Sequence, residues 1–222
     1  MAKAPPLTPT ELAFIKAAVD TIIPADERSP SGSDCGVVDF IEREIAGAWG
    51  DGARLYRDGP FLVGKPEHGY QLRFTPRELL KAGIGAANAW TRNVYGNDFD
   101  CLAQAERVAA LTAFEQGSAE FQELPSREFF EALLSITMEG FFADPRFGGN
   151  RDLTAWKMIG YPGLPADYRD AVTSAFGKRY DQAPGRLPIF PMNEIHGHET
   201  ESRGRRRRRH GLDRQHPRAR AD

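Results

Sequence analysis

The stretch "LTPTELAFIKAAVDTIIP", residues 7–24, predicts an amphipathic α-helix with a well-defined start. Thr8 stands at the N-cap position, and Glu11 completes a capping box in which each side chain accepts a hydrogen bond from the other's backbone N–H. Pro9 fits the first helical position, where its missing N–H is not needed. The apolar residues recur at helical spacing and predict one buried stripe, made of Leu12, Ile15, Val19 and Ile22.

The same Thr-Pro-x-Glu cap recurs at residues 75–78 and opens a second long helical pattern. Further apolar patterns predict helices near residues 36–50, 102–116, 126–141, 153–159 and 168–176. No alternating run of useful length predicts a β-strand. We therefore expect an all-α protein, an irregular helical bundle of about six helices with long loops. Residues 1–191 are predicted to form this helical domain, and residues 192–222 a disordered Arg-rich tail.

The charge of the chain is unevenly distributed along the sequence. The formal net charge of the whole chain is −2, but residues 201–222 contain nine arginines against three acidic residues, a net charge of +6. Residues 1–200 therefore carry −8, and the basic character belongs to the tail alone. A tail of this kind binds nucleic acid or an anionic surface in some proteins. It has no aromatic residue to stack on bases, so this function is only an alternative, and we expect no nucleic-acid partner.

Targeting signals and cysteines leave the compartment open. No apolar run approaches the roughly 18 residues that cross a bilayer, and "MAKAPPLTPTE" lacks the charged and apolar regions of a signal peptide. Taken literally, the sequence predicts a soluble cytoplasmic protein, although a mature exported form with an added start Met has the same appearance. Cys35 and Cys101 are compatible with one disulfide bridge or with two unrelated thiols.

The segment "GIGAAN", residues 83–88, is a near match to the dinucleotide-binding pattern G-x-G-x-x-G. That pattern needs a preceding strand, which delivers the pyrophosphate to a helix N-terminus. Here "RELLKA", residues 77–82, indicates a helix already in progress, and Asn88 replaces the last glycine. The small residues predict close helix–helix packing instead: Gly83, Ala86, Ala87 and Ala89.

Histidine usage gives no support for a histidine-based active site. Four of the five histidines follow residue 195, so His68 stands alone in a loop of the body. A zinc centre or a general base needs further ligands or an orienting partner around it. The chain also lacks a nucleophile elbow, a phosphate-binding loop and an H-E-x-x-H motif. We predict no catalytic, cofactor-binding or metal-binding residue; a free-standing helical enzyme that uses His68 is the alternative.

The most unusual stretch is "FFADPRFGGNRDLTAWKMIGYPG", residues 141–163. Its "GGN" would suit an anion-binding backbone nest, but Asp144 and Asp152 flank it and would repel an anion. Adjacent glycines permit positive φ, prolines restrict the ends, and aromatic residues supply packing surface. We favour a structural or interface loop, with these candidate residues: Asp144, Pro145, Phe147, Gly148, Gly149, Asn150, Trp156, Tyr161 and Pro162.

Three blocks of the sequence together resemble the gluconate 2-dehydrogenase subunit 3 family. They are "LTPTELAFIKAAVDTIIPAD", "GVVDFIEREIAG" and "MEGFFADPRFGGNRDLTAWKMIGYPG". The resemblance runs from about Leu7 to Pro165, and the third block is the most specific. It carries Glu139-Gly140, Asp144-Pro145, Phe147-Gly148-Gly149-Asn150, Trp156 and Gly160-Tyr161-Pro162-Gly163 in order.

The resemblance implies a non-catalytic small subunit of a periplasmic, membrane-associated sugar or sugar-acid dehydrogenase complex. In such complexes a large flavoprotein of the glucose–methanol–choline oxidoreductase type holds FAD and oxidises the sugar. A cytochrome c subunit with haem often passes the electrons on. The small subunit is expected to bind no cofactor, to stabilise the flavoprotein and to help its maturation or export. It would meet the membrane only through the complex.

Two features depart from the family pattern. The sequence shows no twin-arginine signal, so export would require a longer natural chain or transport together with a partner. The Arg-rich tail does not resemble the family either, and we assign it no function. Relatives act on gluconate, glucosides, fructose and other polyols, so the resemblance does not choose the substrate.

Overall fold

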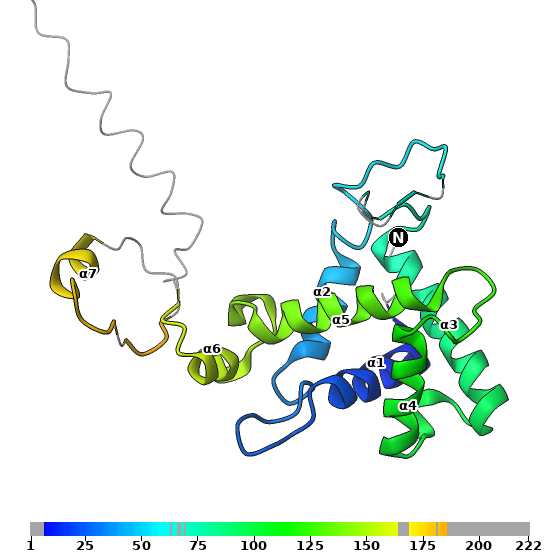
Figure 1. Ribbon diagram of the computed structural model, residues 1–222, viewed down its shortest axis with the longest axis horizontal. Coiled ribbons are helices and arrows are strands. Elements are labelled where there is room, and N and C mark those ends of the chain that lie inside the picture. Colours follow the sequence, from blue (N-terminus) through cyan, green and yellow to red (C-terminus); the bar gives the residue numbers. More distant parts are fainter. Residues whose placement is uncertain are drawn as a thin grey trace, which may run out of the picture. The chain divides into compact units, whose positions relative to one another are not determined.

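The chain folds into α-helices joined by long connections. The computed structural model describes residues 7–62, 64–65, 68, 70–163, 169–180 and 182–185. Its α-helices, shown in Figure 1, are α1 (Pro9–Ile22), α2 (Val37–Ala46), α3 (Pro76–Tyr95), α4 (Gln104–Glu115), α5 (Ser126–Phe142), α6 (Thr154–Ile159) and α7 (Arg169–Ser174). Short 3₁₀ helices are η2 (Phe99–Cys101), η3 (Pro145–Phe147) and η4 (Arg151–Leu153). No strand occurs in these ranges, which confirms the all-α prediction.

The predicted Arg-rich tail, residues 192–222, lies outside the described residues, and so does the predicted boundary at residue 191. Within the described ranges, an isolated parallel bridge pairs Gly163 with Gly185. The described residues form seven α-helices, where about six were expected.

Two identical caps start α1 and α3, as the sequence predicts. The Thr8 hydroxyl accepts the backbone N–H of Glu11 at 3.3 Å, and the Glu11 carboxylate accepts that of Thr8 at 2.7 Å. In α3 the same two bonds join Thr75 and Glu78, at 3.2 and 2.8 Å. Each box satisfies two backbone donors that a helix N-terminus otherwise leaves unpaired.

Helix α5 lies at the centre of the packing. It contacts α1, α2, α3, α4 and α6, and Figure 1 shows it running across the other helices. Its inward side carries four large buried apolar residues, Phe129, Leu133, Ile136 and Phe141. The core is rich in phenylalanine, and the rings of Phe14 and Phe99 lie 4.7 Å apart between centroids. Burial of these side chains supplies the main driving force for the fold.

Close packing of α3 on α5 explains part of the small-residue segment at 83–88. A Cβ atom at Gly83 would lie 2.0 Å from the Phe129 ring, so only glycine fits there. Asn88 is buried, and its side-chain oxygen accepts the backbone N–H of Phe99 at 3.1 Å. The prediction of helix packing is therefore right for Gly83 and Ala87, which are buried. It is wrong for Ala89, which is exposed because it lies on the outer side of α3.

Helix α2 ends earlier than predicted. Its inward residues Val37, Phe40, Ile41 and Ile45 are buried. The helix stops at Ala46, with Gly47 as its C-cap residue, whereas the predicted range ran to Gly50. Turns follow it up to Leu55, and most of the described residues from there to Leu72 are exposed.

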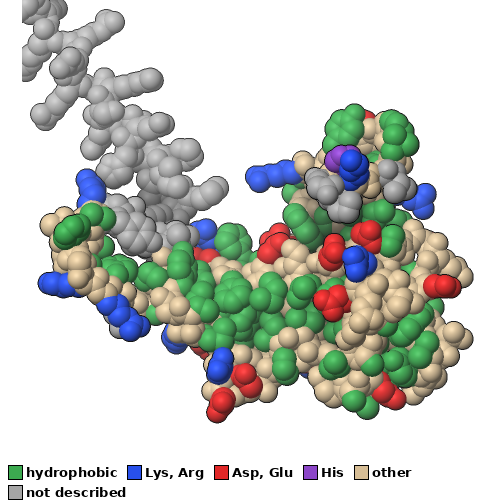
Figure 2. All heavy atoms as spheres, viewed as in Figure 1, with side chains coloured by type: hydrophobic (Ala, Val, Ile, Leu, Met, Phe, Trp, Pro, Cys, Tyr) green, Lys and Arg blue, Asp and Glu red, His purple; other side chains and the backbone are tan. Residues whose placement is uncertain are grey.

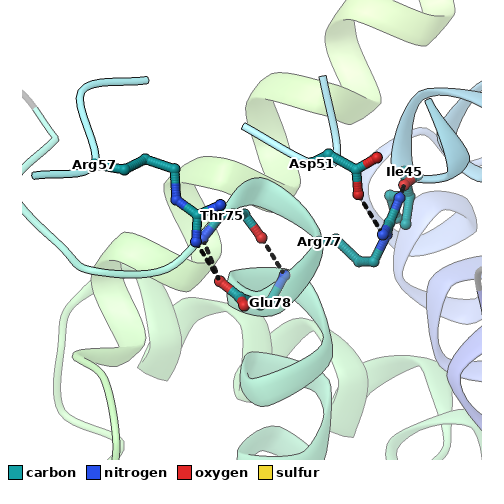
Figure 3. Close-up of polar contacts among 6 residues, drawn as sticks. All are labelled: Ile45, Asp51, Arg57, Thr75, Arg77 and Glu78. Carbon is teal, nitrogen blue, oxygen red and sulfur yellow. Dashed lines mark hydrogen bonds and ion pairs between the residues drawn. The ribbon is translucent and has the colours of Figure 1, made fainter. Parts of the chain in front are cut away.

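Two arginines hold the ends of the connection from α2 to α3 close to these helices. The Arg77 guanidinium donates to the Ile45 carbonyl at 2.9 and 2.7 Å and lies 2.5 Å from the Asp51 carboxylate. Arg57 reaches the Glu78 carboxylate at 4.0 Å (Figure 3). These contacts close the C-terminal end of α2 against the start of α3, because orphan helix carbonyls need donors.

Candidate functional site

The loop at residues 141–163 leaves the end of α5 through two 3₁₀ turns and enters α6. Its glycines are required by close approach. A Cβ atom at Gly149 would lie 1.9 Å from the carbonyl oxygen of Gly140 in α5. Gly148 has a φ of 112°, and a Cβ atom there would lie 3.3 Å from the Phe40 backbone nitrogen of α2. The two glycines therefore let this loop lie directly on the backbones of α2 and α5.

Asn150 ties the two sides of the loop together. It is fully buried. Its side-chain N–H group donates to the Ala143 carbonyl at 3.0 Å, and its side-chain oxygen accepts the Ala155 backbone N–H at 2.9 Å. An asparagine carries a donor and an acceptor in one short side chain. Asn150 therefore joins the end of α5 to the first turn of α6.

Three residues that are not glycine have positive φ in this loop. They are Asn150, Asp152 and Leu153, with φ values of 46°, 58° and 59°. Asparagine and aspartate tolerate this region better than other residues, whereas leucine rarely adopts it. Such conformations persist only where surrounding contacts hold them. The hydrogen bonds of Asn150 and the packing of the following helix supply these contacts.

Arg151 connects the loop to the start of α2, and it is not among the residues predicted from the sequence. Its backbone N–H donates to the Cys35 carbonyl at 2.8 Å, and its guanidinium donates to the Asp34 carbonyl at 2.8 Å. The same guanidinium lies 3.0 Å from the Asp39 carboxylate. The partners lie more than 110 positions away in the sequence. A local sequence pattern therefore cannot predict these contacts of Arg151.

Trp156 faces inward and is nearly buried at 4% exposure. Its indole N–H donates to the Phe142 carbonyl at 2.8 Å, which satisfies an orphan carbonyl at the end of α5. The Tyr161 ring meets the Trp156 ring edge-on at 5.0 Å, and its backbone N–H donates to the Trp156 carbonyl at 2.9 Å. Pro162 lies at the exit, where its carbonyl accepts the Gly185 N–H at 3.0 Å.

The first turn of the loop faces outward. The Asp144 carboxylate accepts the Arg146 backbone N–H at 3.0 Å, and Pro145 is the first residue of η3. The Phe147 side chain is 45% exposed, and the Arg146 guanidinium lies over its ring at 4.7 Å. The loop candidates therefore divide into two groups, with Asn150 and Trp156 inside and Phe147 at the surface.

The other candidates of the sequence analysis lie apart from this loop. His68 is exposed, and its Nδ1 atom accepts the Lys65 backbone N–H at 3.2 Å. Cys35 is buried and Cys101 is exposed, and both are free thiols rather than a bridge. Burial raises the pKa of the Cys35 thiol. The described ranges hold no cluster of three His, Cys, Asp or Glu side chains arranged for a metal ion.

A groove of about 520 Å³ runs along the outer side of α3. Its floor is made of small residues, and the loop after α4 forms one wall. Its lining includes Ala82, Gly85, Ala86, Ala89, Trp90 and Phe121. This groove accounts for the exposed part of the small-residue segment.

The described residues thus define an all-α domain in which a glycine-rich loop braces three helices. The family model for gluconate 2-dehydrogenase subunit 3 matches residues 9–163, from the start of α1 to the end of the braced loop. The chain belongs to this family. Membership implies a small subunit of a dehydrogenase complex of that type, an oxidoreductase that contains further subunits.

No curated protein matches the chain, and neither does any solved structure. Among the described helices, none combines the length and the apolar composition that a transmembrane segment requires.

Proposed function

We propose that this chain is a non-catalytic small subunit that binds a large FAD-containing dehydrogenase subunit, stabilises it, and assists its maturation or export. The complex oxidises a sugar or sugar acid of the gluconate or glucoside type on the periplasmic side of the inner membrane. FAD belongs to the large subunit, and a cytochrome c subunit with haem receives the electrons in complexes that contain one.

One observation supports this role best: the distinctive polar groups of the loop bond within the chain. Asn150, Arg151 and the Trp156 indole all donate to backbone carbonyls of this same subunit. Catalytic groups instead need to reach a substrate atom. The family match ends at the same place as this brace. The loop therefore stabilises the fold of this chain. A structural role of this kind suits a subunit that presents a rigid surface to its partner.

Co-expression tests the proposal. The large flavoprotein subunit of the same organism is produced alone and together with this chain, and soluble protein, bound FAD and dye reduction with sugar are measured. We expect the chain to increase all three and to co-purify with the flavoprotein. Equal maturation and activity of the flavoprotein without this chain would refute the proposal.

A second measurement separates this role from a free-standing enzyme. The isolated chain is assayed with the same sugars and dyes, beside a His68→Ala variant. We expect neither preparation to reduce the dye. Activity that the wild-type chain shows and the variant lacks would establish the enzyme alternative.

A further inference from the structure

Helix α5 carries a second row of apolar residues beside its buried side. Phe130, Leu134, Met138 and Phe142 follow one another at intervals of four residues, which places them on one ridge of the helix. Met138 is 39% exposed, and the other three are half-buried. Phe130 and Phe142 also pack partly against the core, whereas Met138 projects from it.

Helix α6 extends this apolar surface. Met158 and Ile159 are 42% and 56% exposed, and α6 contacts α5. Figure 2 shows hydrophobic side chains gathered over α5 and α6. We call this surface the α5–α6 face; it consists of Phe130, Leu134, Met138, Phe142, Met158 and Ile159. Large exposed apolar patches on soluble domains mark interaction sites.

The neighbouring ridge of α5 gives the face a charge. It carries Arg127, Glu131, Ser135 and Glu139, again at intervals of four. The Arg127 guanidinium is used within the chain, where it donates to the Glu115 carbonyl at 3.1 Å. Glu131 and Glu139 are exposed carboxylates beside the apolar ridge. A complementary partner would have an apolar surface edged by lysine or arginine.

This charge pattern argues against a second copy of the chain as the occupant. In a two-fold arrangement the same patch meets itself. Antiparallel packing of α5 on its copy, centred near Leu134 and Ser135, would bring Glu131 of one chain close to Glu139 of the other. Two carboxylates at an apolar contact repel each other and lose water. A different protein with basic groups avoids both costs.

The geometry points to the α5–α6 face as the surface through which this chain docks on the large flavoprotein subunit, in an apolar groove edged by basic side chains. This inference rests on the proposed function, which supplies the partner. Two methionines suit such a contact because their flexible side chains adapt to an irregular surface. The brace at residues 141–163 fixes α6 to the end of α5 and so holds the two parts of the face together.

Substitution at the centre of the face tests the inference. Met138→Glu places a carboxylate where the partner's apolar groove would bury it, so we expect binding to the flavoprotein to weaken by about 30-fold or more. Val108→Glu is the matched control, because Val108 is a 48% exposed apolar residue of α4. Its binding should equal that of the wild-type chain. Affinities are measured by titration of purified flavoprotein, and folding by thermal unfolding of each free variant.

A second variant tests the charged edge of the face and leaves its apolar residues unchanged. Glu131→Lys with Glu139→Lys alters only exposed positions. We expect weaker binding to the flavoprotein by about tenfold at low salt and a smaller difference at high salt, because screening reduces both attraction and repulsion.

The outcomes separate the two proposals. Wild-type binding that both variants retain would overturn the docking face and leave the proposed function intact. A wild-type chain that neither binds nor helps the flavoprotein would overturn both. A wild-type homodimer that Met138→Glu converts to monomer would assign the face to a second copy and overturn the inference.

Discussion

At the scale of single residues, the candidate loop is held by side chains whose polar groups are all used within the fold. Asn150 bonds to both sides of the loop, and Trp156 bonds to the last turn of α5. Sequence alone indicated that these residues were structural or interfacial. It did not indicate which of them face inward, because burial depends on helices far away in the sequence. Arg151 was missed for the same reason, since its partners precede it by more than 110 positions.

Asn150→Ala should lower the free energy of unfolding by about 2–4 kcal/mol. The substitution removes two hydrogen bonds and leaves the Ala143 carbonyl and the Ala155 N–H without this partner. Denaturant unfolding of the purified chain measures the change. Asn93→Ala serves as a control, because Asn93 is exposed on α3, and it should change stability by no more than about 0.5 kcal/mol. Equal effects of the two substitutions would contradict the bracing role.

Trp156→Ala should destabilise the chain by about 3–5 kcal/mol, since a large buried side chain is lost. Trp156→Phe keeps most of the packing and loses the bond to Phe142, so we expect a cost of about 1–2 kcal/mol. Complex that still forms with either variant should bind its sugar with the wild-type constant. A changed substrate preference, measured by steady-state kinetics, would place the loop at the active site instead.

At the scale of elements, the helices could be predicted where their signals are local. Both capping boxes and the apolar stripe of α1 need only residues three or four positions apart, and they occur as expected. The end of α2 was placed too late because Gly47 and Gly50 are both credible stop signals. The second side of α5 was visible only as extra apolar residues, Phe130 and Leu134, since periodicity cannot tell core from partner surface.

Two glycines of α3 should respond to alanine in opposite ways. Gly83→Ala would push a Cβ atom to 2.0 Å from the Phe129 ring, so we expect a loss of about 1–3 kcal/mol. Gly85 faces open space, and Gly85→Ala should raise the free energy of unfolding by about 0.5–1 kcal/mol, because alanine has the higher helix propensity. Thermal unfolding of both variants tests this pair. A stabilising Gly83→Ala would mean that α3 and α5 pack less closely than described.

The cap of α3 should make stability depend on acid. The backbone N–H of Thr75, which bonds to the Glu78 carboxylate, lowers the pKa of Glu78 from its ordinary value of 4.5. The stabilisation is therefore present above about pH 4.5 and is lost as the pH falls through the lower, folded-state pKa. Glu78→Gln should remove this part of the acid dependence. Unfolding titrations of the two proteins run from pH 6 to pH 3, about one and a half units either side of the ordinary pKa. Identical pH profiles would refute the contribution of the Glu78 carboxylate to stability.

At the scale of the whole molecule, the family model matches residues 9–163, which hold α1 to α6, and α7 follows this range. The charge of the sequence divides further along the chain. Residues 1–200 carry the acidic excess and residues 201–222 the basic excess. The all-α class followed from helix caps and apolar periodicity alone. The role as a subunit did not follow from these patterns. An exposed apolar face can be assigned to a partner only because the family belongs to a complex with other subunits.

Removal of residues 192–222 should leave the folded domain intact. We expect the melting temperature of the shortened chain to stay within about 2 °C of the full chain. Its co-purification with the flavoprotein should also be unchanged, because the proposed docking face lies on α5 and α6. Thermal unfolding and co-expression measure the two properties. A clear loss of stability or assembly would show that the tail belongs to the functional protein.

The two bonds of Asn150 also bear on the order of events during folding. Its partners, Ala143 and Ala155, are separated by twelve positions, and the chain between them includes three residues at unfavourable positive φ. Leucine at positive φ is locally unfavourable, and Arg151 of this turn pairs with Asp39 of α2. We therefore expect the turn to close after α5 and α2 have met, and the surface made of α5 and α6 to be completed last. A partner that recognises this surface would bind only fully folded copies of the small subunit. Assembly of the complex would then select for correct folding.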